Sequence, residues 1–365
     1  MTAIKSHPQL STLNDEVPLH ITNLRLAPTQ IELDTMTFTW GSILLHLNGQ
    51  RLHPCIIDMN KAGGCPFDVN INGREIRDTP ITEGDLQIFG KYRPPFEGYG
   101  RQERFDLFIR CCLNNKNGQT CITTVPNGKI YELMKGFLNN YLGGNHCHFV
   151  NQLTISELPG VHRLPAGLHF KVNELFVPGN SLEAIEVFTP IIHESSFPLN
   201  VLLVSVSNPR DPIFRTPIFK SANTVRLGMP ATAAQQDWVP TLLHLDNQFV
   251  QLFEYEITFK QLFSVVRHWI QNPRPVDRKF ATILEKVQKA LYALMKVLNG
   301  NECLIPCRNT PEFCTGISFP VNDEVELNCY GVRAPGAAAT ELTYPFMMVM
   351  ESMPRGTAVS HFTSV

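Results

Sequence analysis

The sequence has little charge of either sign and no long apolar run. Only 18% of its 365 residues are charged, the formal net charge is -2, and the basic residues are scattered. Proteins that bind nucleic acid through its phosphates need clustered Lys and Arg, so we expect no direct nucleic-acid binding. No segment approaches the roughly 20 apolar residues of a membrane-spanning helix. The first residues, MTAIKSHPQL, lack the apolar core of a signal peptide. We therefore expect a soluble protein that is made in the cytosol and binds no membrane.

Several local motifs of catalysis are also missing. The sequence contains no GxxxxGK phosphate loop, no GxGxxG after a strand, no GxSxG elbow and no HExxH. These absences exclude the common P-loop, dinucleotide-binding, α/β-hydrolase and zinc-protease sites. A Ser/His/Asp arrangement assembled from distant segments stays open, but no local pattern indicates one.

Ten cysteines are too few for a disulfide framework in a chain of this length. Cys303, Cys307, Cys314 and Cys329 form a candidate zinc site, although their gaps of 3, 6 and 14 residues match no pair of CxxC knuckles. Buried free thiols are the alternative interpretation of these four residues. The tripeptide His146–His148 is a second candidate cluster, with the same alternative.

Short apolar runs separated by turn residues predict a mainly β chain. Asn48-Gly49 indicates a hairpin, and Gly143-Gly144-Asn145 indicates a boundary between domains at 1–145 and 146–365. Many short strands suggest a sandwich or barrel in each domain. The predicted strands are 21–26, 31–38, 43–47, 105–113, 121–125, 168–172, 182–188, 201–206, 213–219, 224–227, 324–330 and 342–350.

Two amphipathic helices are predicted within about 259–300, as an insertion in the second domain. Apolar residues recur at helical spacing from Phe259 to Ile270 and again from Phe280 to Leu298. For the second helix we expect Asp277 as N-cap and Asn299-Gly300 as the stop. No fixed-period repeat of the solenoid kind is visible.

The stretch from Trp40 to Gly73 contains the best candidate for a catalytic residue. Asp58 follows the strand-like run Cys55–Ile57 and precedes the turn at Gly63-Gly64. A carboxylate at the end of a buried strand can act as a general base. The alternative is a turn carboxylate that accepts backbone N–H groups.

Segments of this chain resemble the herpesvirus dUTPases, single chains in which two dUTPase-like domains are fused. TFTWGS (37–42), HPCIIDMNKAGG (53–64) and FDVNING (67–73) are similar to the N-terminal half of that family. PAGLHFKVNELFVPGNSLEAIEVFTP (165–190) is similar to the opening of its C-terminal domain, where a strand leads through a Pro-Gly turn into another strand. PRGTAVSHFTSV (354–365) is similar to the tail that closes over the nucleotide. The resemblance implies a mainly β fold of two fused dUTPase-like β-barrel or sandwich domains.

The resemblance also implies a degenerate substrate site. Asp58 matches the family's catalytic carboxylate, but Lys61 stands where a Tyr packs under the deoxyribose. Arg210 is the nearest match to the Arg that grips the phosphates, and the Asp211 that follows it should repel them. Arg355 stands in the tail, which lacks the later glycines of the family. Mg²⁺ would be needed only if the chain hydrolyses dUTP, so we otherwise expect no cofactor.

These departures are most like the dUTPase-related, catalytically degenerate branch of the family. The leading hypothesis is a non-catalytic, monomeric protein that binds host or viral proteins in the host cytoplasm or nucleus and modulates host defence or gene expression. An active dUTP diphosphatase with Asp58 as base is the first alternative, and a viral capsid or structural β-protein is the second. The candidate binding elements are the loop 90–101 and the helices 259–298 with the segment 301–316.

Overall fold

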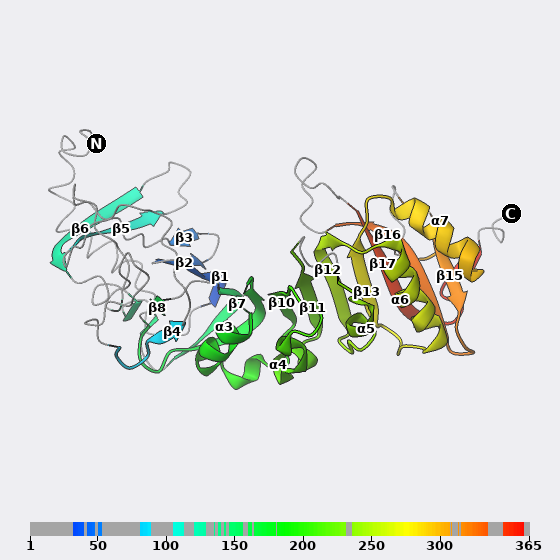
Figure 1. The fold of residues 1–365 in the computed structure, drawn as a ribbon. Coiled ribbons are helices and arrows are strands. Elements are labelled where there is room, and N and C mark those ends of the chain that lie inside the picture. Colours follow the sequence, from blue (N-terminus) through cyan, green and yellow to red (C-terminus); the bar gives the residue numbers. More distant parts are fainter. Residues whose placement is uncertain are drawn as a thin grey trace. The chain divides into compact units, whose positions relative to one another are not determined.

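A computed structural model of the chain shows a mainly β protein, as the sequence predicts, with two compact units at Met1–Ser196 and Phe197–Val365 (Figure 1). The division differs from the boundary expected near residue 145. The residues that the structure describes are 32–39, 42–47, 50–52, 81–88, 105–112, 120–128, single positions within 135–143, 146–155, 160–162, 164–179, 181–230, 236–306, 308, 313, 315–334 and 346–360.

The first unit contains a mixed sheet in the order β9-β7-β1-β2-β3. The hairpin predicted at Asn48-Gly49 is confirmed, because Leu47 of β2 pairs with Gln50 of β3. β7 runs parallel to β1 and to β9, so one sheet includes strands on both sides of the expected boundary. The strands are β1 Glu32–Thr39, β2 Ser42–Leu47, β3 Gln50–Leu52, β7 Cys147–Ile155 and β9 His169–Val177.

Two small antiparallel pairs complete the strands of the first unit. β4 (Leu86–Ile88) pairs with β8 (Gly160–His162), and β5 (Phe105–Cys112) pairs with β6 (Thr120–Gly128). The latter pair confirms the strands predicted at 105–113 and 121–125.

The strand predicted at 182–188 is wrong. That segment forms the helix α3 (Ser181–Phe188), which buries Ala184, Ile185 and Phe188. This difference removes the strand–turn–strand arrangement that the resemblance implied for 165–190. The short 3₁₀ helices η1 (Thr189–Ile191) and η2 (Glu194–Ser196) follow α3.

Four strands of the second unit are parallel and follow one another in chain order, each joined to the next through a helix. This order, β10-β11-β12-β13, is that of proteins built from stacked strand–helix units. The sequence predicted a sandwich or barrel without a repeat. The strand–helix units have unequal lengths, so they give no fixed period in the sequence. The strands are β10 Val201–Ser205, β11 Thr224–Gly228, β12 Phe249–Glu256 and β13 Lys279–Ile283, and the helices are η3 Pro212–Arg215, α4 Pro217–Ser221, α5 Val239–Leu242 and α6 Phe259–Gln271.

The other strands of the second unit extend this sheet with antiparallel partners. β17 pairs with β13, and β16, β15, β14 and β18 continue outward from β17. The helix α7 (Val287–Leu298) contacts β15, β16 and β17 and lies beside α6 (Figure 1). The strands are β14 Asn301–Leu304, β15 Gly316–Pro320, β16 Val325–Arg333, β17 Phe346–Pro354 and β18 Val359–Ser360.

The two predicted helices exist, but they are not an insertion, because β13 lies between them in the sheet. A capping box of Thr258 and Gln261 starts α6, and the left-handed Asn299 ends α7 as predicted. The second helix begins at Val287 rather than near Asp277, whose φ of 68° is not that of an N-cap. β13 is buried on both faces, which gives an apolar run without strand alternation.

The strand predicted at 213–219 is also wrong, because this segment forms η3 and α4. Asp211 and Thr216 cap these helices, and a proline follows each cap. An N-cap residue followed by proline is a helix-start signal, so the sequence contained the correct pattern.

No helix in the described part of the chain is long and apolar enough to cross a membrane.

The segment 301–316, expected to be a surface element, contributes to the core of the second unit. β14 pairs with β15 and β18, and Cys303 and Ile305 are buried in a cluster with Tyr330 and Met347. This segment therefore supports folding.

We expect Ile305→Ala to lower the free energy of unfolding by about 3 kcal/mol, because it empties a fully buried site. The control is Leu304→Ala at the neighbouring, partly exposed position, for which a loss of less than about half that size is expected. Urea unfolding of both variants measures the difference. Equal, small losses would show that 301–316 is a separable surface loop.

Candidate functional site

The structure describes two of the four predicted nucleotide-binding residues, Arg210 and Arg355, and does not bring these two together. Asp58 and Lys61 lie outside the described residues. Arg210 follows the C-terminal end of β10. Arg355 follows the C-terminal end of β17, which is antiparallel to β13 and therefore ends at the edge of the sheet where β13 begins. Because β10 and β13 belong to one parallel set, these two arginines lie at opposite edges of the sheet.

Local contacts explain both arginine segments without a ligand. The Asp211 carboxylate accepts the backbone N–H of Ile213 at 3.0 Å and caps η3. Arg355 donates to the carbonyl oxygen of Asn322 at 2.7 Å and lies 3.6 Å from the Asp323 carboxylate. The acid next to Arg210 is therefore a helix cap.

The predicted zinc ligands that the structure describes lie on different faces of the sheet. Cys303 is in the cluster of Tyr330, whereas Cys329 precedes Tyr330 in the same strand and points to the other face. Both thiols are buried and free, and burial raises the pKa of Cys303 to about 12. Cys307 and Cys314 lie outside the described residues. Within the described part of the chain, no three His, Cys, Asp or Glu side chains are grouped to hold a metal.

The candidate cluster at His146–His148 is divided by strand alternation. His148 is buried, and its Nε2 lies 3.1 Å from the carbonyl oxygen of Leu142. Burial lowers the pKa of His148, and the nearby His146 lowers it further against the raising effect of the Leu142 carbonyl. Cys147 points to the opposite side of β7 from both histidines. These three residues therefore lie at the N-terminal end of β7 as packing residues.

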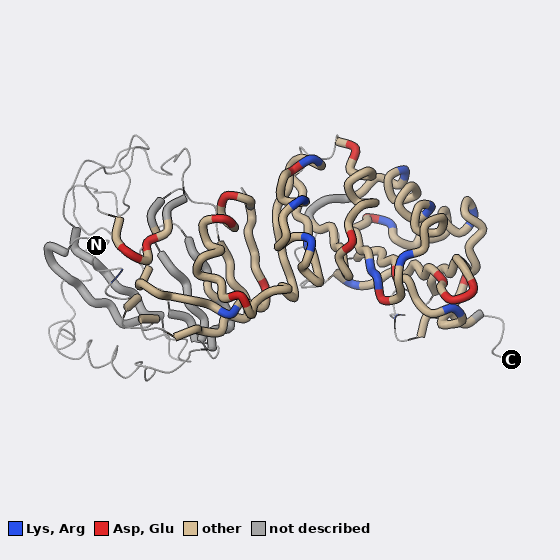
Figure 2. Tube along the Cα trace, turned by 90° about the horizontal axis from the view of Figure 1, so that it is seen from below, with Lys and Arg blue, Asp and Glu red and all other residues tan. Residues whose placement is uncertain are grey.

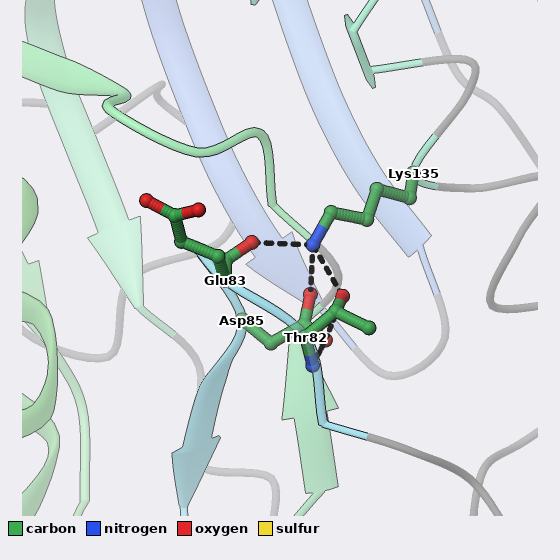
Figure 3. Close-up of polar contacts among 4 residues, drawn as sticks. All are labelled: Thr82, Glu83, Asp85 and Lys135. Carbon is green, nitrogen blue, oxygen red and sulfur yellow. Dashed lines mark hydrogen bonds and ion pairs between the residues drawn. The ribbon is translucent and has the colours of Figure 1, made fainter.

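Lys135 in the first unit holds a turn in place (Figure 3). Its ammonium donates to Thr82 Oγ1 at 2.5 Å, to the Glu83 carbonyl oxygen at 2.5 Å and to Asp85 Oδ1 at 3.1 Å. The other oxygen of Asp85 accepts the backbone N–H of Thr82 at 2.8 Å. All three acceptors of the ammonium belong to one turn, so this cluster stabilises the 82–85 turn.

A buried charge network lies in the second unit, where the sheet changes from parallel to antiparallel. The Glu351 carboxylate accepts hydrogen bonds from Arg308 at 3.0 and 3.2 Å, forms an ion pair with Lys279 at 3.0 Å and accepts the Tyr330 hydroxyl proton. Burial raises the pKa of Glu351, but the bonds from Arg308, Tyr330 and Lys279 outweigh it and hold the pKa below its usual value. Every oxygen of this carboxylate is occupied, so the network is structural.

A second buried carboxylate on the same face anchors the C-terminal segment. Glu326 accepts the backbone N–H groups of Gly356 at 3.0 Å and Ala358 at 2.7 Å, and the Asn328 side chain at 3.0 Å. These bonds place residues 356–358 beside β16. Gly356, which belongs to the segment that resembles a nucleotide-closing tail, therefore donates its backbone N–H to the Glu326 carboxylate of the same chain.

Arg226 differs from these satisfied groups. It occupies the middle of β11, where its register neighbours are Leu203 and Gln251, and neither is an acid. Its Nε is buried, and the described part of the structure offers that atom no hydrogen-bond acceptor. A buried donor without an acceptor costs about 1–3 kcal/mol.

Arg226 belongs to a face of the parallel strands that we call the strand face. Strand alternation places it there with Thr224, Phe249, Gln251 and Phe253, whereas Val225, Leu227, Val250 and Leu252 form the opposite, fully buried face. Phe249 and Phe253 are only partly buried and flank Gln251 along β12. Gln251 itself is buried, and Phe249 packs against the buried cluster of Tyr330 and Met347. Arg226 is therefore the group on this face that is suited to bind a carboxylate. The strand face is the candidate functional site.

A family model described as a domain of unknown function (DUF3557) matches residues 129–285. No curated protein and no solved structure matches the chain. The matched range ends two residues after β13, so it includes the parallel strands β7 and β9 to β13 and leaves out the antiparallel strands that follow.

Neither Arg226 nor the Glu351 network was predicted from the sequence. A single Arg within the run TVRLG was a usable signal, because an ionisable residue inside an apolar strand needs a partner or a function. The four network residues are far apart in the sequence and give no local signal.

We expect Glu351→Gln to lower the free energy of unfolding at pH 7 by about 2 kcal/mol, since it leaves two cations without a counter-charge. Water screens both cations, because the Arg308 and Lys279 side chains are 38% and 30% exposed, and this screening limits the expected loss. Glu285→Gln, at an exposed ion pair with Lys286, is the matched control and should change stability by less than about 0.5 kcal/mol.

The effect of Glu351→Gln should depend on pH. Because the folded-state pKa of Glu351 lies below the ordinary 4.5, its contribution is complete above about pH 4.5 and is lost as the pH falls through the folded-state pKa. Urea unfolding from pH 7 to pH 3 should show the wild type and the variant converging. A constant difference over this range would contradict the role of the charge.

Proposed function

We propose that this chain is a non-catalytic protein-binding protein that uses the strand face of its second unit. The observation that carries the proposal is Arg226, a partly buried cation whose Nε has no acceptor in the described structure. Binding sites commonly keep groups that reduce the stability of the free protein. An acidic side chain of a partner would supply the missing acceptor.

The architecture supports the same proposal. Proteins built from stacked strand–helix units commonly bind partners on a strand surface. In this chain that surface would be centred on β11, because β13 is buried on both faces. The described polar clusters around Lys135 and Glu351 are fully bonded internally, which is the property of structural groups.

Descent from the dUTPase-related branch stays a prediction, and it concerns the first unit most. The segments that carry the resemblance around Asp58 lie outside the described residues. Under this hypothesis the chain would be a monomer that binds host or viral proteins in the host cytoplasm or nucleus. The separation of Arg210 from Arg355 favours this degenerate branch over an active dUTP diphosphatase with Mg²⁺.

Arg226→Met tests the proposal because Met keeps most of the apolar length of the side chain and removes the unsatisfied donor. We expect the free energy of unfolding to rise by about 1 kcal/mol. We also expect affinity capture from a lysate of the source cells, quantified by mass spectrometry, to lose at least one protein about tenfold.

The control is Arg215→Met, which removes an exposed cation outside the strand face. This variant should keep its stability within about 0.5 kcal/mol and retain every captured protein. The proposal fails if Arg226→Met destabilises the chain by more than 1 kcal/mol, or if the two variants capture the same proteins in equal amounts.

A further inference from the structure

The helices α6 and α7 carry charge of one sign. Neither helix contains Asp or Glu, although the chain as a whole has a net charge of -2. Their exposed cations are Lys260 and Arg267 on α6 and Lys289 and Lys296 on α7.

These cations lie in two stripes that face away from the core. Lys260 and Arg267 are seven residues apart, as are Lys289 and Lys296, so each pair lies on one side of its helix. The opposite sides bury Val266 and Leu294 among other residues. α6 and α7 contact each other and lie side by side in the second unit (Figure 1), and Figure 2 marks the charged positions along the trace. We call this surface the helix face.

The structure gives the four cations no carboxylate partner within the described part of the chain. Two acids of the second unit pair with other cations, Glu285 with Lys286 at 3.3 Å and Asp246 with Arg274 at 2.7 Å. The helix face therefore presents uncompensated positive charge.

Exposed apolar side chains lie on the same two helices as the cations. Phe259, Tyr292 and Val297 are 42%, 53% and 61% exposed, and they are half of the large exposed apolar side chains of the described residues. The Lys296 ammonium lies 4.4 Å from the centre of the Tyr292 ring. An apolar and cationic surface complements an amphipathic segment that carries carboxylates beside apolar residues.

Charge and composition decide between three kinds of partner. Nucleic acid is disfavoured because few cations are present and the negative chain repels a polyanion at long range. A lipid surface generally needs about four to eight clustered cations together with an apolar anchor, and this face is at the lower limit. An acidic peptide needs only local pairing, which the two stripes provide.

We infer that the helix face binds an acidic amphipathic segment of a partner protein. This surface goes beyond the strand face, because the helices and Arg226 use different faces of the sheet. Loss of binding at one face therefore leaves the other to be tested separately.

Fluorescence anisotropy tests this inference with the full chain and a labelled helical peptide of about 18 residues. The peptide carries Glu on one side and Leu on the other, and a second peptide has Lys in place of Glu. The test variant is Lys260→Gln/Arg267→Gln/Lys289→Gln, which leaves the Lys296–Tyr292 contact intact. The control variant, Lys171→Gln/Arg215→Gln/Lys220→Gln, removes three exposed cations elsewhere.

We expect the acidic peptide to bind the wild type and the control variant equally, and the test variant about tenfold more weakly at low salt. Tyr292→Ala should weaken binding at high salt as well, since the apolar contact is not screened. Equal binding by the test and control variants would overturn the inference. It would also be overturned if the wild type bound a single-stranded oligonucleotide or phosphatidylserine vesicles through these cations and did not bind the acidic peptide.

Discussion

The second unit depends on the Glu351 carboxylate, where β13 meets β17 and the sheet changes from parallel to antiparallel. Its partners come from β13, β16 and the segment after β14, so one buried charge joins the parallel strands to the antiparallel ones. Burying a carboxylate is costly unless several donors compensate for the lost water. Here three side chains do so, and removing the charge would leave the cations without a partner.

The charged side chains of this chain fall into two kinds, those whose polar atoms are all bonded within the chain and those that keep a polar atom without a partner in the described structure. Lys135 has three acceptors, and Glu351 and Glu326 each have several donors, so none of them is available for chemistry. Arg226 lacks an acceptor for Nε on the strand face, and the cations of α6 and α7 lack carboxylate partners in the described structure. The unpaired groups on these two surfaces are cations. Both proposed surfaces therefore select partners with negative charge, although the chain itself is slightly acidic.

Local signals in the sequence predicted part of this fold well. The Asn48-Gly49 hairpin, the helix that begins at Phe259 and the stop at Asn299 each depend on a few neighbouring residues, and the structure confirms them. β13 was taken for helix because it is apolar on both faces. The repeat of strand–helix units was missed because their lengths differ. Contacts such as Lys279 with Glu351 join distant segments, which no local pattern reveals.

The candidate site was predicted less well than the fold. The resemblance directed attention to Asp58, Lys61, Arg210 and Arg355, of which the structure describes the last two and places them at opposite edges of the sheet. Incubation of the pure chain with dUTP and Mg²⁺ tests the proposal that the chain does not hydrolyse dUTP. The account predicts no dUMP or pyrophosphate above the level without protein. Turnover that Asp58→Asn abolishes would contradict it.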